Sequence, residues 1–372
     1  MGINRVMQNT NNYKKAVKWL DGLNQNKIVP GLERISKLMK IFNDPQNKLR
    51  IITIGGTNAK GSTSYNLSNT LMQTGKKIGC YTSPHLHSVR ERIKINNKYI
   101  DKKKFSEKLF NLKNEATKNK IKITYFEALT ALAYLYFSEE KVDYAVMEIG
   151  LGGEWDAVNV ADAEIAILTT LGLDHTEYLG NDLHEIATTK AKIVRKESIV
   201  ITGWDKEYHK YIPKSKELHE GKSVKEWIQI CIKCLKLSIQ PIISKIPGRQ
   251  ENYLNFTLDT AHNEQAIEHI LSLNNNYTKI IVGMLQDKDI ESFVSKLPLN
   301  STILACNLNS ERSASSEYIY NICKKNNIRC KQFVNVKEAI LSIKAEKTLI
   351  TGSFYTVSEA RTYFKLEGYS EL

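Results

Sequence analysis

The feature that most constrains this chain is a regular alternation of short apolar segments with amphipathic helical ones. It begins at the apolar run 49–54, which ends in Gly55-Gly56 and is followed by a helical pattern over 62–74. Apolar runs of strand length separated by helices are typical of parallel strands buried on both faces. The pattern therefore predicts a doubly wound α/β fold, with further strands at 77–82, 144–149 and 164–170, a hairpin at 92–100, and helices at 103–118, 125–138 and 183–194.

A second alternating series begins near Pro247, and a chain of 372 residues suits two domains. Between the two series, the Lys-rich stretch 205–245 has little strand character and one clear helical pattern near 224–237. We predict a first domain over 1–245, whose last part is a connector, and a smaller Rossmann-like domain over 246–372. The strands expected in the second domain lie at 255–259, 279–284, 302–305, 329–333 and 348–351, with helices between them.

The charge balance and hydropathy argue against several classes of partner, although the basic charge keeps nucleic-acid binding as a weak alternative. Lys plus Arg number 53 and Asp plus Glu 40, a net charge of +13, but the lysines are scattered and form no arginine-rich arm. No apolar run approaches the roughly 18–20 residues that a membrane span requires, and residues 1–18 lack the apolar core of a signal peptide. We therefore expect a cytoplasmic protein that binds neither nucleic acid nor membrane.

The six cysteines give little sign of a metal site or disulfide framework. Only Cys231 and Cys234 are close in sequence, on one face of a predicted helix, and Cys323 with Cys330 makes a poor second pair. We expect reduced core cysteines.

The strongest local signal is the stretch from Gly56 to Thr63, Gly-Thr-Asn-Ala-Lys-Gly-Ser-Thr, which joins a predicted strand to a predicted helix. Backbone N–H groups in such a turn point at phosphate oxygens, and the helix N-terminus favours an anion. Lys60 could neutralise charge on the β- and γ-phosphates. Its spacing differs from the common P-loop, because Gly61 separates Lys60 from Ser62. The alternative is a glycine-rich turn with no ligand, but the context favours a P-loop-type ATPase domain.

Polar side chains follow several other predicted strands. Ser83 follows the second strand, Glu148 ends another, and Asp174 with His175 follows the next. In a parallel sheet these strand ends meet at one crevice, where a hydroxyl, a carboxylate and an imidazole make a plausible Mg²⁺ shell. Each residue alone has an ordinary structural explanation, and their shared location is what favours function.

These motifs, in this order, resemble the folylpolyglutamate synthase/dihydrofolate synthase family of the Mur ligase superfamily. The resemblance rests on Gly-Thr-Asn-Ala-Lys-Gly-Ser, Ser-Pro-His-Leu, Tyr-Phe-Glu-Ala-Leu-Thr, Glu-Ile-Gly-Leu-Gly-Gly and Leu-Asp-His-Thr-Glu-Tyr-Leu-Gly. It continues with Pro-Gly-Arg, Asp-Thr-Ala-His-Asn, Gly-Met-Leu-Gln-Asp-Lys-Asp and Thr-Gly-Ser-Phe-Tyr, and so nearly spans the chain. It implies an ATP-dependent ligase that joins L-glutamate to a folate or dihydropteroate carboxylate. We expect a monomer with Mg²⁺ as cofactor and ATP as co-substrate.

The resemblance also implies a role for each matching residue. Lys60, Glu148, His175 and Lys190 would be catalytic, with Ser83, Glu148, His175 and a carbamylated Lys190 holding metal. The substrate pocket would be formed by Thr124, Tyr125, Phe126, Glu127, Trp155 and Asp156. The residues expected to bind ATP are Gly56, Thr57, Asn58, Ala59, Gly61, Ser62, Thr63, Arg249, Asp259 and His262.

Several residues depart from the family pattern near the predicted site. Ala59, Lys192 and Thr260 stand where glycine is usual, and Glu154 replaces an arginine. The stretch 205–245 is shorter than usual and contains no asparagine to contact adenine. Two alternatives therefore stay open, a Mur-superfamily amide ligase for another acid and a catalytically weak nucleotide-binding homologue. The motifs do not separate dihydrofolate synthase from folylpolyglutamate synthase.

Overall fold

The computed structural model describes residues 2–23, 29–174, 176–274 and 276–368. Its contacts divide the chain into two compact units. Unit 1 contains the described residues up to Pro84 and from Val89 to Ile243, and unit 2 contains His85–Ser88 and the described residues from Ser244 onward. None of the described helices is both long and apolar enough to cross a membrane.

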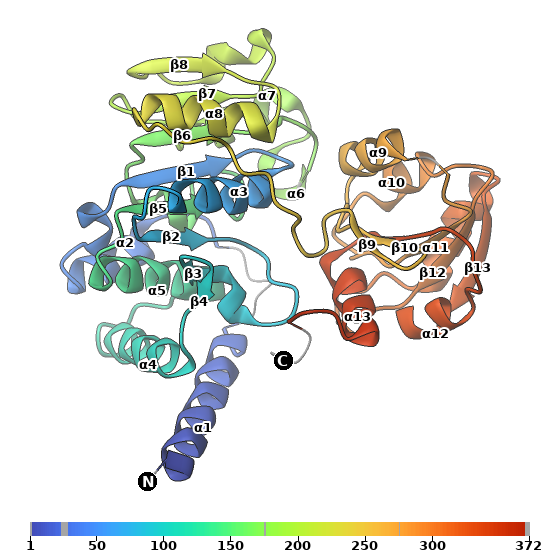
Figure 1. Cartoon of the computed structure of the whole chain (residues 1–372), viewed down its shortest axis with the longest axis horizontal. Coiled ribbons are helices and arrows are strands. Elements are labelled where there is room, and N and C mark those ends of the chain that lie inside the picture. The colour runs from blue at the N-terminus through green and yellow to red at the C-terminus, as the bar shows by residue number, and fades with distance from the viewer. Residues whose placement is uncertain (1, 24–28, 175, 275, 369–372) are drawn as a thin grey trace. The chain divides into compact units, whose positions relative to one another are not determined.

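Unit 1 is built on an eight-stranded sheet in the order β4-β3-β2-β5-β1-β6-β7-β8 (Figure 1). All neighbours pair in parallel except around β3, which is antiparallel to β2 and β4. The β3–β4 turn at Asn96-Asn97 has two positive φ angles, +45° and +62°, as a two-residue hairpin turn requires. The strands are β1 (Ile51–Gly55), β2 (Ile78–Tyr81), β3 (Ile93–Ile95), β4 (Lys98–Tyr99), β5 (Tyr144–Glu148), β6 (Ile165–Leu168), β7 (Ile199–Thr202) and β8 (Glu217–Glu220).

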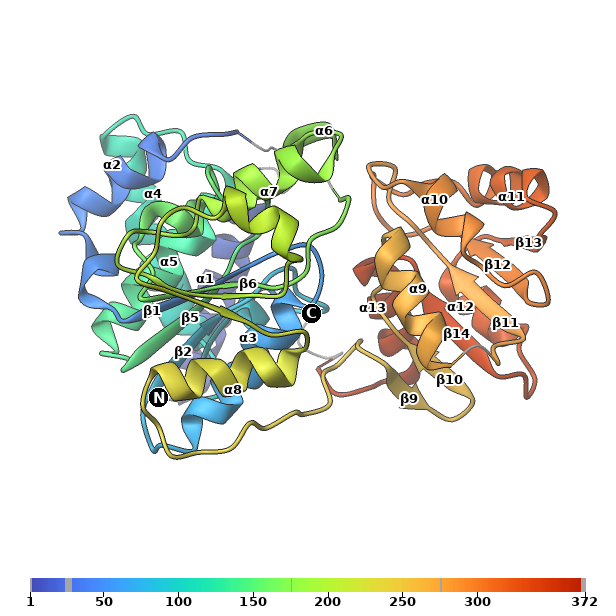
Figure 2. The same ribbon diagram turned by 90° about the horizontal axis from the view of Figure 1, so that it is seen from above.

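Helices cover both faces of this sheet, because the side chains of its central strands alternate between two apolar cores. Ile51 packs into a core with α1, α2, α4, α5 and α7, whereas Ile52 and Ile54 pack into another with α3 and α8. Figure 2 shows α3 and α8 together on one side of the strands. The helices are α1 (Gly2–Asp21), α2 (Glu33–Ile41), α3 (Lys60–Met72), α4 (Lys102–Lys118), α5 (Tyr125–Glu139), α6 (Thr176–Leu179), α7 (Leu183–Ala191) and α8 (Val224–Cys234), with short 3-10 turns at Pro45–Lys48, Val89–Arg92, Ala157–Val160 and Lys206–Tyr211.

Unit 2 repeats this design around a six-stranded sheet in the order β13-β12-β11-β14-β10-β9, parallel except for the β9–β10 pair. Ile280 and Val282 face a core formed with α9, α10 and α11, while Ile281 faces one formed with α12 and α13. The strands are β9 (Glu251–Tyr253), β10 (Phe256–Leu258), β11 (Lys279–Val282), β12 (Thr302–Cys306), β13 (Arg329–Phe333) and β14 (Thr348–Thr351), and the helices are α9 (Glu264–Leu273), α10 (Ile290–Ser295), α11 (Ser316–Lys325), α12 (Val336–Leu341) and α13 (Phe354–Phe364).

These arrangements confirm the predicted α/β fold with a doubly wound sheet and a smaller Rossmann-like companion. The stretch 205–245 contains the predicted helix, α8, and little strand, but the one short strand that forms there, β8, was not predicted and pairs with β7. Glu217, Leu218 and Glu220 are exposed, so this edge strand lacks the apolar pattern that marks a buried one. The strands β7 and β9 were also not predicted.

Candidate active site

The turn between β1 and α3 has a backbone that demands small residues. Gly56 has φ of +129°, and a Cβ there would lie 2.0 Å from Thr169 Oγ1. Ala59 immediately precedes α3 and has φ of +65°, the left-handed conformation that favours glycine. The alanine in place of the usual glycine is therefore held in a strained conformation.

The turn is fixed to the segment that follows β6. Thr57 N–H donates to Thr170 O at 2.7 Å, and Asn58 N–H donates to Thr170 Oγ1 at 2.9 Å. Thr57 Oγ1 donates to Gly172 O at 2.9 Å, and Thr169 Oγ1 donates to Asn58 O at 2.7 Å. Thr169, Thr170 and Gly172 were not among the predicted site residues, because the sequence alone did not place β6 next to β1.

Two lysines converge on this turn. Lys60 Nζ donates to Gly56 O and Thr57 O, both at 3.0 Å. Lys190 Nζ, on α7, donates to the same Gly56 carbonyl at 3.1 Å, and Lys190 is buried with 3% exposure. The cationic Lys60 beside the N-terminus of α3 makes this turn a favourable position for an anion.

A buried carboxylate also lies beside the start of α3. Glu148, at the end of β5, is 3% exposed, and its Oε2 accepts from the Ser83 N–H at 3.0 Å. A Cβ at Gly61 would lie 3.5 Å from Glu148 Oε1, so the carboxylate contacts the first turn of α3 directly. The structure thus brings Ser83 and Glu148 to the turn as predicted from the strand ends. His175 lies outside the described residues.

The remaining residues of the turn have different exposures. Ser62 is partly exposed, whereas Thr63 is fully buried and its Oγ1 donates to Ala59 O at 2.8 Å. Thr63 therefore supports the turn from inside the helix, and contact between its hydroxyl and a ligand stays a prediction.

The predicted substrate segment begins with a helix cap. Thr124 and Glu127 form a reciprocal capping box at α5: Glu127 N–H donates to Thr124 Oγ1 at 3.2 Å, and Thr124 N–H donates to Glu127 Oε2 at 2.7 Å. The Glu127 carboxylate also pairs with Arg34 Nε at 3.1 Å. Arg34 lies in the segment Pro-Gly-Leu-Glu-Arg-Ile at 30–35 and was not among the predicted site residues. Its ion pair fixes the N-terminus of α5.

The aromatic residues of the predicted pocket differ in exposure. Tyr125 is buried below the guanidinium of Arg92, whose Cζ lies 5.4 Å from the ring centroid. Phe126 packs against Gly150, where a Cβ would lie 2.5 Å from Phe126 Cζ. Trp155 is half exposed and is the aromatic face most accessible to a ligand.

Asp156 organises the loop that follows β5. Its Oδ2 accepts from the N–H groups of Gly150 and Leu151 at 3.0 and 2.8 Å, and its Oδ1 accepts from Val158 N–H at 2.9 Å. Burial raises the pKa of Asp156 to about 6, although these three hydrogen bonds and the charge of Lys60 oppose the shift. Both carboxylate oxygens are thus already occupied by the backbone.

In unit 2, the three residues predicted to contact nucleotide lie near one another. The Arg249 guanidinium lies 5.2 Å from the centroid of the Phe354 ring, and the His262 ring lies 6.2 Å from the same ring. Asp259 accepts from Gln250 N–H at 2.9 Å and from Ala261 N–H at 2.8 Å. Burial raises the pKa of Asp259, and the neighbouring Arg249 charge opposes this shift.

Comparison with known proteins identifies relatives of this chain. The Mur ligase middle domain family matches residues 54–226. A dihydrofolate synthase/folylpolyglutamate synthase from Buchnera aphidicola subsp. Schizaphis graminum is 31% identical over 395 residues, which cover 88% of this chain and 90% of that protein. The dihydrofolate synthetase of Saccharomyces cerevisiae is 41% identical over 167 residues, 44% of this chain and 39% of that protein. Among solved structures, Escherichia coli FolC in complex with DHPP and ADP has a TM-score of 0.84 and 26% identity, and the match covers 94% of this chain and 97% of that one.

Proposed function

The chain belongs to the dihydrofolate synthase/folylpolyglutamate synthase family, and we propose on this basis that it adds L-glutamate to the carboxylate of a folate or dihydropteroate at the expense of ATP. The observation that carries the proposal is the convergence of Lys60, Lys190 and Glu148 on the β1–α3 turn. An ADP-bound relative that shares the fold along nearly the whole chain supports it.

The reaction defines what the turn must do. A carboxylate is a poor acyl donor, so transfer of the γ-phosphoryl group of ATP converts it to an acyl phosphate. The amine of glutamate then attacks the acyl carbon, the tetrahedral intermediate collapses to an amide, and phosphate leaves. In this mechanism Lys60 turns from the Gly56 and Thr57 carbonyls to the phosphates and stabilises charge on the transferring group. Gly56, Thr57, Asn58, Ala59, Gly61, Ser62 and Thr63 would bind the phosphates.

The donor set at the end of β5 suits a divalent cation. Glu148 offers a buried carboxylate and Ser83 a hydroxyl, and oxygen ligands are those that Mg²⁺ prefers. We propose that these residues hold Mg²⁺, together with His175 and a carbamylated Lys190. When bound, the cation supplies charge stabilisation to the phosphoryl group.

We assign the acid substrate to the start of α5 and to the loop after β5. Trp155 offers an exposed ring for stacking on a pterin. We assign Phe126 to the same substrate pocket. Thr124, Glu127 and Asp156 act by holding these segments in position, since their polar atoms bond to the backbone. Tyr125 supports them from the core. We further propose that Arg249, Asp259 and His262 contact the nucleotide.

The direct test is phosphate release from Mg-ATP and glutamate with dihydropteroate, with tetrahydrofolate, and with no acceptor, followed by mass spectrometry. Release that needs a pterin acid, with a product heavier by one glutamyl residue, would support the proposal and show which of the two activities the chain has. ATP binding without release in any mixture would favour the non-catalytic alternative. Release only with an unrelated acid would favour a different amide ligase.

A further inference from the structure

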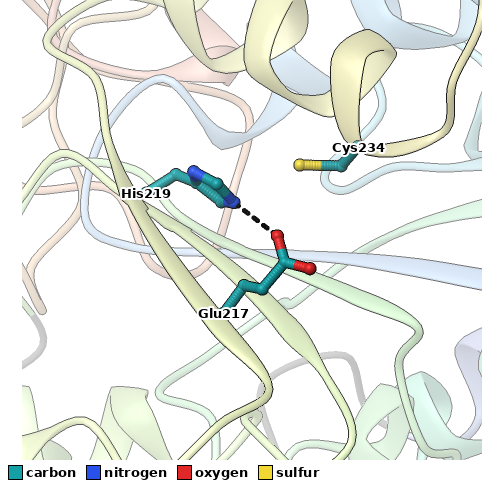
Figure 3. Close-up of side chains that lie close together, drawn as sticks. All are labelled: Glu217, His219 and Cys234. Carbon is teal, nitrogen blue, oxygen red and sulfur yellow. Dashed lines mark hydrogen bonds and ion pairs between the residues drawn. The ribbon is translucent and has the colours of Figure 1, made fainter.

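Three potential metal ligands meet at the edge of the unit 1 sheet, away from the candidate active site. Glu217 and His219 are two residues apart on β8, so their side chains lie on the same face of the strand. Cys234, the last residue of α8, lies beside them, as Figure 3 shows. One ligand atom from each residue lies within 4.8 Å of the other two.

The packing of α8 fixes the position of this thiol. Trp227, Ile228 and Cys231 are buried in the core between α3, α8 and the sheet. Cys234 follows Cys231 by three residues and is only partly buried, at the end of the same helix. The His219 and Glu217 side chains are 37% and 48% exposed. Cys234 is therefore held at the end of a well-packed helix, and all three groups remain open to an ion from solvent.

The chemistry of the three side chains favours zinc over the hard cations. Thiolate and imidazole are soft or borderline ligands, whereas Mg²⁺ and Ca²⁺ require sets of oxygen atoms. The distance between His219 Nε2 and Glu217 Oε2 is 2.9 Å, and two ligand atoms on a tetrahedral Zn²⁺ at about 2.0–2.1 Å from the ion would be roughly 3.3 Å apart. A small side-chain rotation would admit the ion, which would replace this hydrogen bond and displace the thiol proton to solvent.

We propose that Glu217, His219 and Cys234 bind one Zn²⁺, with water in the fourth position, and that the ion fastens the edge strand β8 to the end of α8. This site is separate from the predicted Mg²⁺ ligand Glu148. In the strand order, β8 lies four positions from β5, a distance of about 19 Å at roughly 4.8 Å per strand. All three ligands lie within 205–245, the stretch in which the chain is shorter than the family pattern.

Cobalt provides a selective probe, because a Co²⁺–thiolate bond gives a near-ultraviolet charge-transfer band that oxygen and imidazole ligands do not. The chelator-treated full chain is titrated with Co²⁺ and then with Zn²⁺. We expect one Co²⁺ per chain with a thiolate band, and displacement of Co²⁺ by one Zn²⁺. Zn²⁺ should also raise the thermal unfolding midpoint, since it binds the folded state.

Variants locate the ligands. Cys234→Ser should abolish the thiolate band, and Cys234→Ser, His219→Ala and Glu217→Gln should each weaken Zn²⁺ binding at least tenfold. Cys330→Ser and His269→Ala, which change a partly buried cysteine and an exposed histidine of unit 2, should leave binding unchanged. Circular dichroism checks that each variant is folded.

Several results would overturn the proposal. These are absence of the thiolate band in the wild type, persistence of the band in Cys234→Ser, or equal Zn²⁺ affinity in the wild type and all three ligand variants. The last result would identify adventitious binding elsewhere on the chain.

Discussion

At the scale of single residues, Lys60 is the side chain on which the proposed chemistry depends most. It donates to two carbonyls of the β1–α3 turn and lies at the start of α3. We expect Lys60→Ala to lower turnover by a factor on the order of 100 or more, the usual effect of removing one group that stabilises transition-state charge. Phosphate-release kinetics measure this, with circular dichroism as the check on folding. Lys76→Ala is the control, since Lys76 has a side chain that is 41% exposed and pairs with Asp143. Unchanged turnover in Lys60→Ala would refute the assignment.

Ala59 provides a second test at this scale, because its φ of +65° is strained for any residue with a Cβ. The left-handed conformation costs an alanine about 1–2 kcal/mol, and glycine loses about 0.5–1 kcal/mol through its greater unfolded-state entropy. The strain is the larger of the two, so Ala59→Gly should raise the free energy of unfolding by about 0.5–1 kcal/mol. Urea denaturation measures the change. Ala161→Gly is the matched control, because Ala161 has a φ of −112° and its replacement should destabilise. A fall in stability for Ala59→Gly would contradict the strain argument.

At the scale of elements, the N-terminus of α5 depends on its capping box. Thr124→Ala removes the side-chain acceptor of the Glu127 N–H and should lower the free energy of unfolding by about 1 kcal/mol. Thr124→Ser retains an acceptor at that position and should recover most of the loss. If the two variants are equally stable, the hydroxyl contributes nothing to the helix. A KM for the pterin acid that rises in Thr124→Ala more than in Thr124→Ser would also support the placement of the substrate at this end of α5.

The C-terminal end of α5 predicts a dependence of stability on pH. Hydrogen bonds from Lys104 and then Lys77 lower the pKa of Glu140 from 4.5 to about 2. Because the folded-state pKa is the lower one, the stabilisation is present above pH 4.5 and is lost as pH falls toward 2. Glu140→Gln should therefore lower the free energy of unfolding by up to about 1 kcal/mol at pH 7. This is the size of an exposed ion pair, and added salt should reduce it. The difference from wild type should shrink between pH 4.5 and pH 2.

Glu139→Gln is the neighbouring control for this prediction. Among the described residues, Glu139 pairs only with Lys108, and its side chain is 61% exposed. Glu139→Gln should therefore lower the free energy of unfolding at pH 7 by only a few tenths of a kcal/mol, about the lower end of the surface range. Chemical denaturation at several pH values compares both variants with wild type. A Glu140→Gln difference that grows on acidification would show that the sign is wrong.

At the scale of the whole molecule, the elements predicted correctly from the sequence are those marked by short apolar runs or by turn residues such as glycine. The central strands β1, β2, β5 and β6 were found because each is a short apolar run, and the β1–α3 turn was found from its glycines and lysine. The edge strand β8 was missed because Glu-Leu-His-Glu lacks that pattern. The site at Glu217, His219 and Cys234 was hidden for the same reason, since two of its ligands lie on that strand.

Other parts of the candidate site required the order of strands in space. Thr169 and Thr170 hold the β1–α3 turn although they lie more than 110 residues away in sequence, and only the pairing of β6 with β1 brings them together. Arg34 was missed because its partner Glu127 lies 93 residues away. The Thr-x-x-Glu spacing at Thr124 is itself a capping signal, so this feature of α5 could have been predicted.

The most direct test of the account is the fate of the carboxylate oxygens of the pterin acid. A pterin acid labelled with ¹⁸O in both carboxylate oxygens is incubated with the chain, Mg-ATP and glutamate, and the phosphate and pterin products are analysed by mass spectrometry. An acyl phosphate intermediate transfers one labelled oxygen to each phosphate released and leaves the other in the new amide, in a product heavier by one glutamyl residue. Unlabelled phosphate, or phosphate release without the amide, would contradict the proposed ligase mechanism.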